Sequence, residues 1–287
     1  DYMLKKKRLS NGVLVIGEEI QFVRSISIGF WVKNGSIDEN SKTNGMSHFI
    51  EHMLFKGTSK RSARQIADEM SGIGGRINAF TSKEVICYYA HILDEHYTTA
   101  LDVLSDMLVH STFDEVEMGK EKGVIIEEIH MDQDSPEDVL YNQFYEAMFK
   151  DQPMGYAILG PESNVSNYSR EDIKAYYHSF YNSGNTVVSV VGKFDFDEMC
   201  DVLEEKLKDY PTGQTHVRQP EVVYTPTLTI KQRDFEQVQV GLAFPAFPNG
   251  DSRKYTLVIL NTILGSGMNA RLFQSLREDK GMVYTVY

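Results

Sequence analysis

The chain has 287 residues, with 29 Lys and Arg against 41 Asp and Glu, which gives a formal net charge of −12. This length fits two domains or one large one, and 41% hydrophobic with 24% charged residues is an ordinary globular composition. An acidic chain lacks the basic face with which proteins neutralise nucleic-acid phosphates, so the charge argues against a nucleic-acid partner. The same charge favours basic peptides through long-range attraction.

Cysteine usage and hydropathy bear on the compartment. Cys87 and Cys200 are the only cysteines and are far apart in the sequence, so they form neither a disulfide framework nor a CxxC site. We find no apolar run near the ~20 residues that a membrane-spanning helix needs. The basic residues 5–8 are not followed by the apolar stretch of a secretory signal. These features predict a cytoplasmic protein without a membrane partner.

The first third of the chain alternates between strand-like and helix-like patterns. Strands are expected where short β-branched apolar runs lie between turn residues, and helices where apolar residues recur every three or four positions. In chain order, the predictions are strands at residues 13–16 and 26–31, a helix from 43 to 57, a helix over 63–71 and a strand pair over 77–93.

Helical patterns dominate the middle of the chain. Helices are predicted at residues 94–110, 113–131, 136–149, 169–181 and 196–207, with an extended loop over 151–167 and one strand at 186–192. Strands and helices that follow in this irregular order are typical of an α+β fold, not of a doubly wound parallel sheet.

A proline-rich, polar stretch at residues 211–226 is the predicted linker. Beyond it we expect strands at 227–231 and 237–244, helices at 253–264 and 271–278, and a strand that starts at 283–287. This pattern places a first domain at residues 1–212 and the start of a second at 213–287. The second domain is expected to be incomplete, because about 60 residues make only a thin core.

The string His48-Phe49-Ile50-Glu51-His52 carries the clearest chemistry. Two histidines four positions apart lie on one face of a helix, a turn from each other, and can bind one metal ion. Glu51 lies beside that face, where a carboxylate can deprotonate a water held by the metal. The alternative is a chance histidine pair on a surface helix, but H-x-x-E-H strings are rare enough by chance to favour the metal site.

A catalytic zinc ion needs a third protein ligand, and we expect it on the helix at residues 113–131. There Glu121, Val124, Ile125 and Glu128 share one stripe that is predicted to face the core. Buried carboxylates need a cation or hydrogen-bond donors. We therefore predict Glu128 as the ligand and Glu121 as a residue that orients a ligand or the water, and we expect Glu127 to be solvated. The alternative for Glu121 is a simple pair with a lysine.

Residues 45–58 (GMSHFIEHMLFKGT) resemble the active-site signature of the insulinase–pitrilysin–mitochondrial processing peptidase family of zinc metallopeptidases. The chain is most similar to the bacterial processing-peptidase-like members. The resemblance implies one zinc ion per chain bound by His48, His52 and Glu128, with Glu51 as general base and Glu121 as an additional active-site acid.

Two further segments carry the resemblance. Residues 74–81 (GGRINAFT) are similar to the family's strand that pairs with the substrate backbone, which implies substrate binding by Asn78, Ala79 and Phe80. An edge strand offers unpaired backbone groups to an extended peptide. Residues 264–287 are also similar to the family, and imply that Arg277 and Tyr284 reach the zinc site from the second half. The alternative for Tyr284 is a core position.

The resemblance implies an α+β fold of two related domains, each a largely antiparallel sheet packed with helices. It also implies a homodimeric zinc metalloendopeptidase that hydrolyses short or unfolded peptides. The competing hypothesis is a catalytically silent family member that acts as a structural or peptide-binding subunit. A serine or cysteine hydrolase is poorly supported, because the sequence has no G-x-S-x-G string and neither cysteine lies in a nucleophile motif.

Overall fold

The computed structural model describes residues 4–218 and 222–287. The chain divides into two compact units, Asp1–Val240 and Gly241–Tyr287, each of which we describe by itself. The predicted linker lies partly outside the described residues, at 219–221. Its first part is attached to the first unit, because the Ser183 N–H donates to the Pro211 carbonyl and the Arg218 guanidinium pairs with Asp38. The predicted domain boundary at residue 212 therefore stays a prediction.

The first unit is built on a six-stranded sheet with the strand order β1-β2-β6-β3-β5-β4. Only β2 and β6 are parallel, and the other four pairings are antiparallel. This confirms a largely antiparallel sheet, although β1 was not predicted. The strands are β1 (Lys5–Arg8), β2 (Leu14–Glu19), β3 (Ser25–Val32), β4 (Arg76–Thr81), β5 (Ile86–Leu93) and β6 (Thr186–Gly192).

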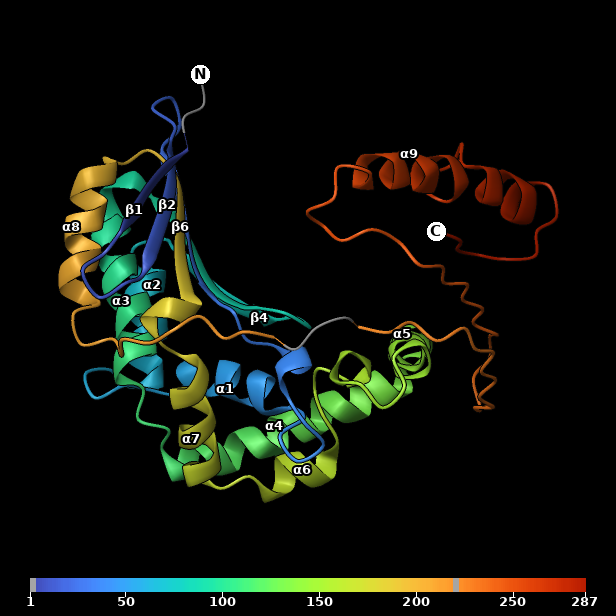
Figure 1. Cartoon of the computed structure of the whole chain (residues 1–287), viewed down its shortest axis with the longest axis horizontal. Coiled ribbons are helices and arrows are strands. Elements are labelled where there is room, and N and C mark those ends of the chain that lie inside the picture. The colour runs from blue at the N-terminus through green and yellow to red at the C-terminus, as the bar shows by residue number, and fades with distance from the viewer. Residues whose placement is uncertain (1–3, 219–221) are drawn as a thin grey trace. The chain divides into compact units, whose positions relative to one another are not determined.

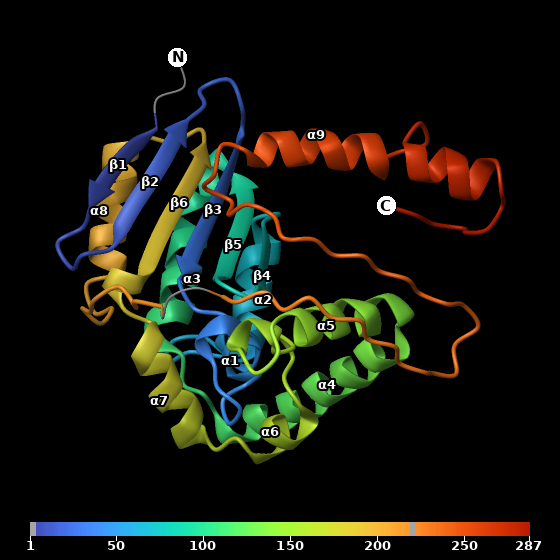
Figure 2. The same cartoon turned by 45° about the vertical axis from the view of Figure 1, so that its right-hand side comes forward.

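Three helices cover one face of this sheet (Figures 1 and 2): α2 (Ala63–Gly72), α3 (Tyr97–His110) and α8 (Phe196–Lys206). The sequence determines which face the helices cover, because side chains alternate between the two faces of a strand and the apolar ones lie on the covered face. On β3, Ile26, Ile28 and Phe30 are buried while Ser25 and Ser27 are exposed. The apolar side of the sheet and the helices together form the core.

A second group of helices lies beyond one end of the sheet (Figure 2). It comprises α1 (Met46–Leu54), α4 (Glu115–Asp134), α5 (Pro136–Met148), α6 (Glu162–Asn167) and α7 (Arg170–Phe180). α6 and a 3₁₀ turn at Pro153–Gly155 lie in the segment predicted as a loop. That prediction was wrong because a six-residue helix is too short to show an apolar period. Among the described residues, no helix is long and apolar enough to span a membrane.

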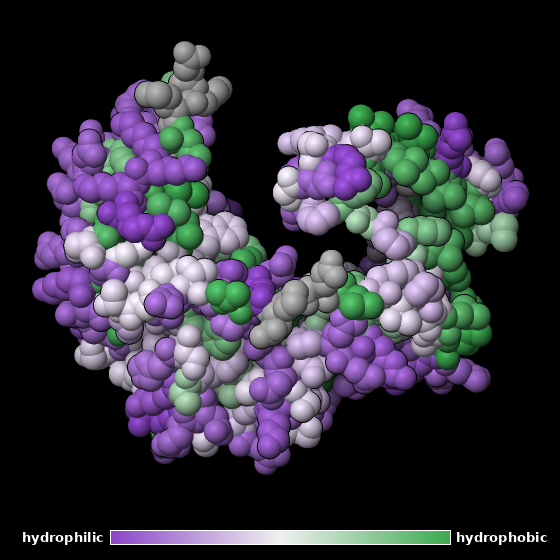
Figure 3. Space-filling model, viewed as in Figure 1, coloured by the Kyte–Doolittle hydropathy of each residue, from purple (hydrophilic) through white to green (hydrophobic). Residues whose placement is uncertain are grey.

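The second unit contains α9 (Lys254–Leu264) and a short helical segment at Phe273–Glu278, close to the predicted helices. The strands expected at 227–231, 237–244 and 283–287 are not formed in the described part of the chain, so those predictions were wrong. A strand needs a neighbour to pair its backbone groups. The apolar side chains of these segments are exposed, for example Leu228 at 87% and Phe244 at 80%. Figure 3 shows hydrophobic side chains on the surface of the second unit.

Candidate metal centre

Helix α1 carries the three predicted residues of the H-x-x-E-H motif, His48, Glu51 and His52. Phe49, Ile50 and Met53 are fully buried and fix which side of the helix faces the core. His48 and His52 therefore lie together, with ring centroids 4.5 Å apart. The four-residue spacing brings the two imidazoles together as the helical geometry requires.

Helix α4 packs against α1 and brings Glu128 to the two histidines. Glu128 Oε2 lies 3.7 Å from His48 Nε2 and 3.5 Å from His52 Nε2. One ligand atom from each of the three residues lies within 4.8 Å of the other two. Two imidazole nitrogens and a carboxylate oxygen at this separation are the donor set of a catalytic zinc site.

The burial along α4 agrees with the predicted stripe at Glu121, Ile125 and Glu127 and differs at Val124. Glu121 and Ile125 are buried, and the Glu127 side chain is 77% exposed and lies 3.7 Å from the His130 ring. Val124, predicted to face the core, is 45% exposed. An apolar period shows which residues share a face of α4, but burial also needs another element packed against each of them.

Glu121 contacts both a histidine and a lysine. Its Oε2 atom lies 3.0 Å from His52 Nδ1, and its Oε1 atom lies 2.6 Å from Lys56 Nζ. When the His52 proton is on Nδ1 and is donated to Glu121, the Nε2 atom, which lies on the side of Glu128, has a lone pair that can bind a metal ion. The two readings of Glu121 are therefore not exclusive, because it accepts from the imidazole and from the ammonium group together.

The electrostatics of His48 fit a metal ligand. Burial, and next the neighbouring His52, lower the pKa of His48 to about 3, so its imidazole is neutral at pH 7 and has a free lone pair. Its Nδ1 atom is buried and has no hydrogen-bond partner among the residues that the structure describes. A neutral imidazole beside a carboxylate that no described arginine or lysine pairs with suits a divalent cation.

Glu51 lies beside the cluster and contacts β4. Thr81 Oγ1 donates a hydrogen bond to Glu51 Oε2 at 2.5 Å. Burial raises the pKa of Glu51, the Thr81 bond opposes this rise, and the Glu128 charge adds to it. A carboxylate with a raised pKa is better matched to proton transfer near neutral pH than a free one.

Strand β4 is an edge strand of the sheet, paired on one side with β5. Along it, Asn78 and Phe80 are exposed, while Ala79 is half-buried against the core. The Phe80 ring contacts Trp31, with centroids 5.8 Å apart. The three residues predicted to bind substrate therefore lie on an open edge next to Thr81 and Glu51.

Arg277 and Tyr284 belong to the second unit. The Arg277 guanidinium lies 5.0 Å from the centroid of the Tyr284 ring and 4.8 Å from that of Phe273. Tyr284 is exposed, which is not the core position considered as the alternative. The two residues lie close together, and their role at the metal centre stays a prediction.

Sequence reasoning missed two residues of the site. Lys56 lies four positions after His52 on the same chain segment, so its spacing was a usable signal. Thr81 is 30 positions from Glu51, and only the packing of β4 on α1 brings them together. No local pattern could have found that contact.

Two family models match the chain. Insulinase (Peptidase family M16) matches residues 14–162, which include α1, β4 and α4. Peptidase M16 inactive domain matches residues 167–287. The chain thus carries two related domains of one family, as expected from its sequence.

Relatives and solved structures agree with these models. The uncharacterized zinc protease YmxG of Bacillus subtilis is 44% identical, over 99% of this chain and 69% of that protein. An uncharacterized zinc protease of Rickettsia felis is 39% identical, over 97% of this chain and 68% of that protein. The fold is similar to that of a protease from Helicobacter pylori, with a TM-score of 0.85 and 21% identity over 99% of this chain and 70% of the other. The chain belongs to the insulinase family of peptidases, family M16.

Proposed function

We propose that this chain is a zinc-dependent endopeptidase that hydrolyses short or unfolded peptides. The observation that carries the proposal is the meeting of His48, His52 and Glu128 within 4.8 Å, with Glu51 beside them. Relatives named zinc proteases are 35–44% identical to this chain over the aligned residues, which supports zinc as the metal. A silent family member would be expected to lack a ligand or the base, and this chain has all four groups.

His48, His52 and Glu128 would hold one zinc ion. Zinc supplies Lewis-acid chemistry: it polarises a peptide carbonyl and lowers the pKa of water. Glu121 fixes the His52 ring through Nδ1, and Lys56 in turn fixes Glu121. Such outer partners keep a ligand's lone pair aimed at the metal position.

Glu51 is the proposed general base. It takes a proton from the attacking water and gives it to the amine that leaves when the peptide bond breaks. Thr81 holds one oxygen of Glu51 through its hydroxyl, so the other oxygen remains free for that proton. The raised pKa of Glu51, caused mainly by burial, favours both halves of this transfer near neutral pH.

The edge of β4 is the proposed peptide-binding element. An extended peptide that adds to this edge is held by main-chain hydrogen bonds, which give affinity with little dependence on its side chains. Asn78, Ala79 and Phe80 would line it on the side next to Thr81. We expect basic peptides to be favoured, because the chain has a net charge of −12.

The test is cleavage of an unstructured basic peptide by this chain, with zinc supplied, in the presence and absence of a chelator. Cleavage that the chelator abolishes and added zinc restores supports the proposal. One zinc ion bound per chain without any cleavage would contradict it and favour the peptide-binding subunit. The predicted homodimer is tested separately by sedimentation, and the predicted cytoplasmic location by fractionation of cells that express the full-length protein.

A further inference from the structure

The N-terminus of α1 lacks a capping side chain of its own. The residue before the helix is Gly45, which has a φ of 100° and makes no side-chain cap. A Cβ atom at this position would lie 2.6 Å from the carbonyl oxygen of Leu159, so a Ser, Thr or Asp cannot replace it without movement of the backbone. The free N–H groups of the first turn must therefore find acceptors elsewhere.

Glu39 supplies those acceptors from a different segment, the loop that follows β3. Its Oε2 atom accepts from Gly45 N–H and from Asn44 Nδ2, each at 2.9 Å, and its Oε1 atom accepts from Ser47 N–H at 2.8 Å. Glu39 is only 3% exposed, and the three donor residues are buried as well. A buried carboxylate with three donors at a helix N-terminus is stabilised by the hydrogen bonds and by the helix dipole.

Asn44 extends this contact to a third segment. Its Nδ2 atom donates to the Ala157 carbonyl as well as to Glu39. The backbones of Asn44 and Gly160 pack so closely that a Cβ atom on Gly160 would lie 2.3 Å from the Asn44 carbonyl oxygen. The first turn of α1 is thus fixed between two loops, and Glu39 is the charged group at the centre of that contact.

The two histidines of the metal centre differ in how they are held. The His52 ring is fixed through Nδ1 by Glu121. The His48 Nδ1 atom has no hydrogen-bond partner in the part of the chain that the structure describes. Because no side chain orients the His48 ring in this way, its position depends on the backbone that carries it. Ser47, whose N–H donates to Glu39, is the residue directly before His48.

We infer that Glu39 is a positioning residue for the metal centre, because it anchors the helical turn that carries His48. This inference rests on the proposed function, since it assumes that the cluster binds zinc. Metal–ligand distances are fixed to within about 0.2 Å, so a small shift of this turn weakens metal binding. Glu39 itself contacts neither the metal position nor the peptide.

The test compares Glu39→Gln with Ser62→Ala in the full chain. Glu39→Gln keeps one acceptor oxygen and places an amide NH₂ against donor groups that now lack a partner. Ser62 caps α2 by accepting from Gln65 N–H, and α2 carries none of the predicted site residues, so Ser62→Ala is the matched loss of a helix cap. Zinc affinity is measured by chelator competition, and the ligand geometry by the visible absorption of the Co²⁺-loaded protein.

We expect Glu39→Gln to weaken zinc binding by about tenfold, the lower end of the loss seen when a direct partner of a metal ligand is removed, and to change the Co²⁺ spectrum. Ser62→Ala should alter neither. Wild-type zinc affinity and spectrum in Glu39→Gln, or equal losses in both variants, would overturn the inference. If Glu39→Gln does not fold, Asn44→Ala, which removes one of the three donors, should give a smaller loss of affinity; an unchanged affinity in that variant would likewise overturn the inference.

These readouts separate the two proposals, because neither depends on cleavage. A protein that binds zinc, shows the Glu39 effect and cleaves nothing overturns the proposed activity and retains the role of Glu39. A wild-type chain that binds no zinc overturns both.

Discussion

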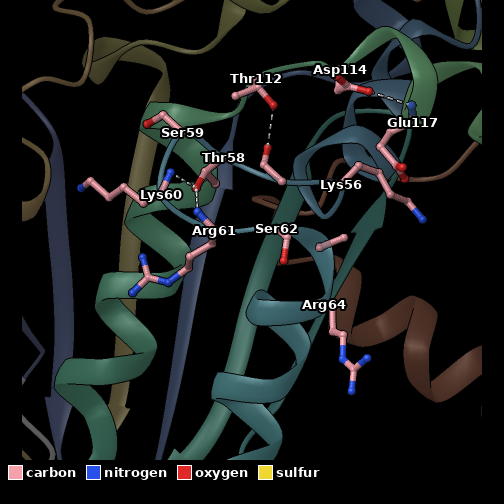
Figure 4. A pocket seen from close by; sticks show the side chains of 12 residues that line it. Lys56, Thr58, Ser59, Lys60, Arg61, Ser62, Arg64, Thr112, Asp114 and Glu117 are labelled. Carbon is pink, nitrogen blue, oxygen red and sulfur yellow. Dashed lines mark hydrogen bonds between the residues drawn. The ribbon is translucent and has the colours of Figure 1, made fainter.

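Two of the clusters of ionisable side chains in the first unit differ in where the positive charge comes from. In the cluster around Arg61, the guanidinium donates to Asp102 and, at 2.9–3.0 Å, to Asp106 and Glu69. Burial lowers the pKa of Arg61, but its hydrogen bonds to these three carboxylates outweigh the effect of burial and raise the pKa overall. Figure 4 shows Arg61 beside Thr58 in a pocket that is lined in part by residues 56–64. The cluster has its own cation.

In the cluster on α1 and α4, Lys56 pairs with Glu121, but no arginine or lysine among the described residues pairs with Glu128. The nearest nitrogens to Glu128 are imidazole nitrogens, and the His48 ring is neutral at pH 7. A carboxylate and two lone pairs converge on one point without an arginine or lysine between them. Buried carboxylates occur in both clusters, so their presence alone does not mark a functional site. The difference is that one cluster is complete and the other requires a cation from solution.

The largest effect on peptide cleavage should follow from a change to Glu51, the proposed general base. Glu51 lies in the cluster on α1 and α4 but is not a predicted metal ligand. Glu51→Gln keeps the size of the side chain and removes its ability to accept a proton. We expect peptide cleavage to fall by about 10²–10⁴-fold, the usual contribution of a general base, with zinc content unchanged. Steady-state kinetics and metal analysis measure both. Cleavage at the wild-type rate would show that Glu51 is not the base.

The next effect separates two adjacent residues of α4. Glu128→Gln replaces a carboxylate ligand with a neutral amide, and we expect zinc affinity to fall by more than ~100-fold, beyond the loss typical of outer partners. Glu127→Gln is the matched control, because its side chain is 77% exposed and its histidine neighbour is His130, which is not part of the predicted metal site. Its zinc affinity should equal that of the wild type. Similar losses in the two variants would contradict the assignment of Glu128.

A change in the Arg61 cluster should affect stability and leave the metal centre intact. Arg61→Leu removes the guanidinium that pairs with the buried Asp106, while Asp102 keeps its pair with Lys206; breaking a buried pair such as Arg61–Asp106 costs about 3 kcal/mol of unfolding free energy. Arg64→Leu is the control, because Arg64 is exposed and pairs with Asp68, which is exposed as well. Chemical denaturation measures the difference, and zinc affinity should stay the same in both. A loss of zinc affinity in Arg61→Leu would show that the two clusters are coupled.

The parts that the sequence predicted are those set by local periodicity. His48, Glu51 and His52 lie close together because they share a short helix. Glu128 could be distinguished from Glu127 because Glu128 lies seven positions after Glu121, and residues seven apart share one face of a helix. β6 enters the sheet between β2 and β3 although it lies more than 150 residues after β3, and no local pattern contains that pairing. Glu39 and Thr81 were missed for the same reason, because their partners come from other segments.

The wrong predictions have a common physical cause. Alternating apolar residues at 237–244 predicted a strand, but a strand forms only where another strand accepts its backbone hydrogen bonds. Val124 satisfied the apolar stripe of α4, yet burial depends on what lies opposite the helix. In both cases the pattern describes a preference of the chain, and the neighbouring elements decide whether it is realised.

Glu121 combines features of both clusters, so its substitution gives the smallest and most discriminating effect. Lys56 neutralises it, as Arg61 neutralises Asp106, but it also accepts from His52. Glu121→Gln should lower zinc affinity by about 10–100-fold if its bond to His52 orients that ligand. Glu117→Gln, which changes a half-buried glutamate of the same helix that pairs with Lys120, is the control and should change nothing. Lys56→Met then separates the two roles: it removes the lysine pair and retains the bond to His52. If zinc affinity falls less in Lys56→Met than in Glu121→Gln, Glu121 acts through its bond to His52. Equal losses of zinc affinity would mean that Glu121 orients His52 only while Lys56 holds the carboxylate in place.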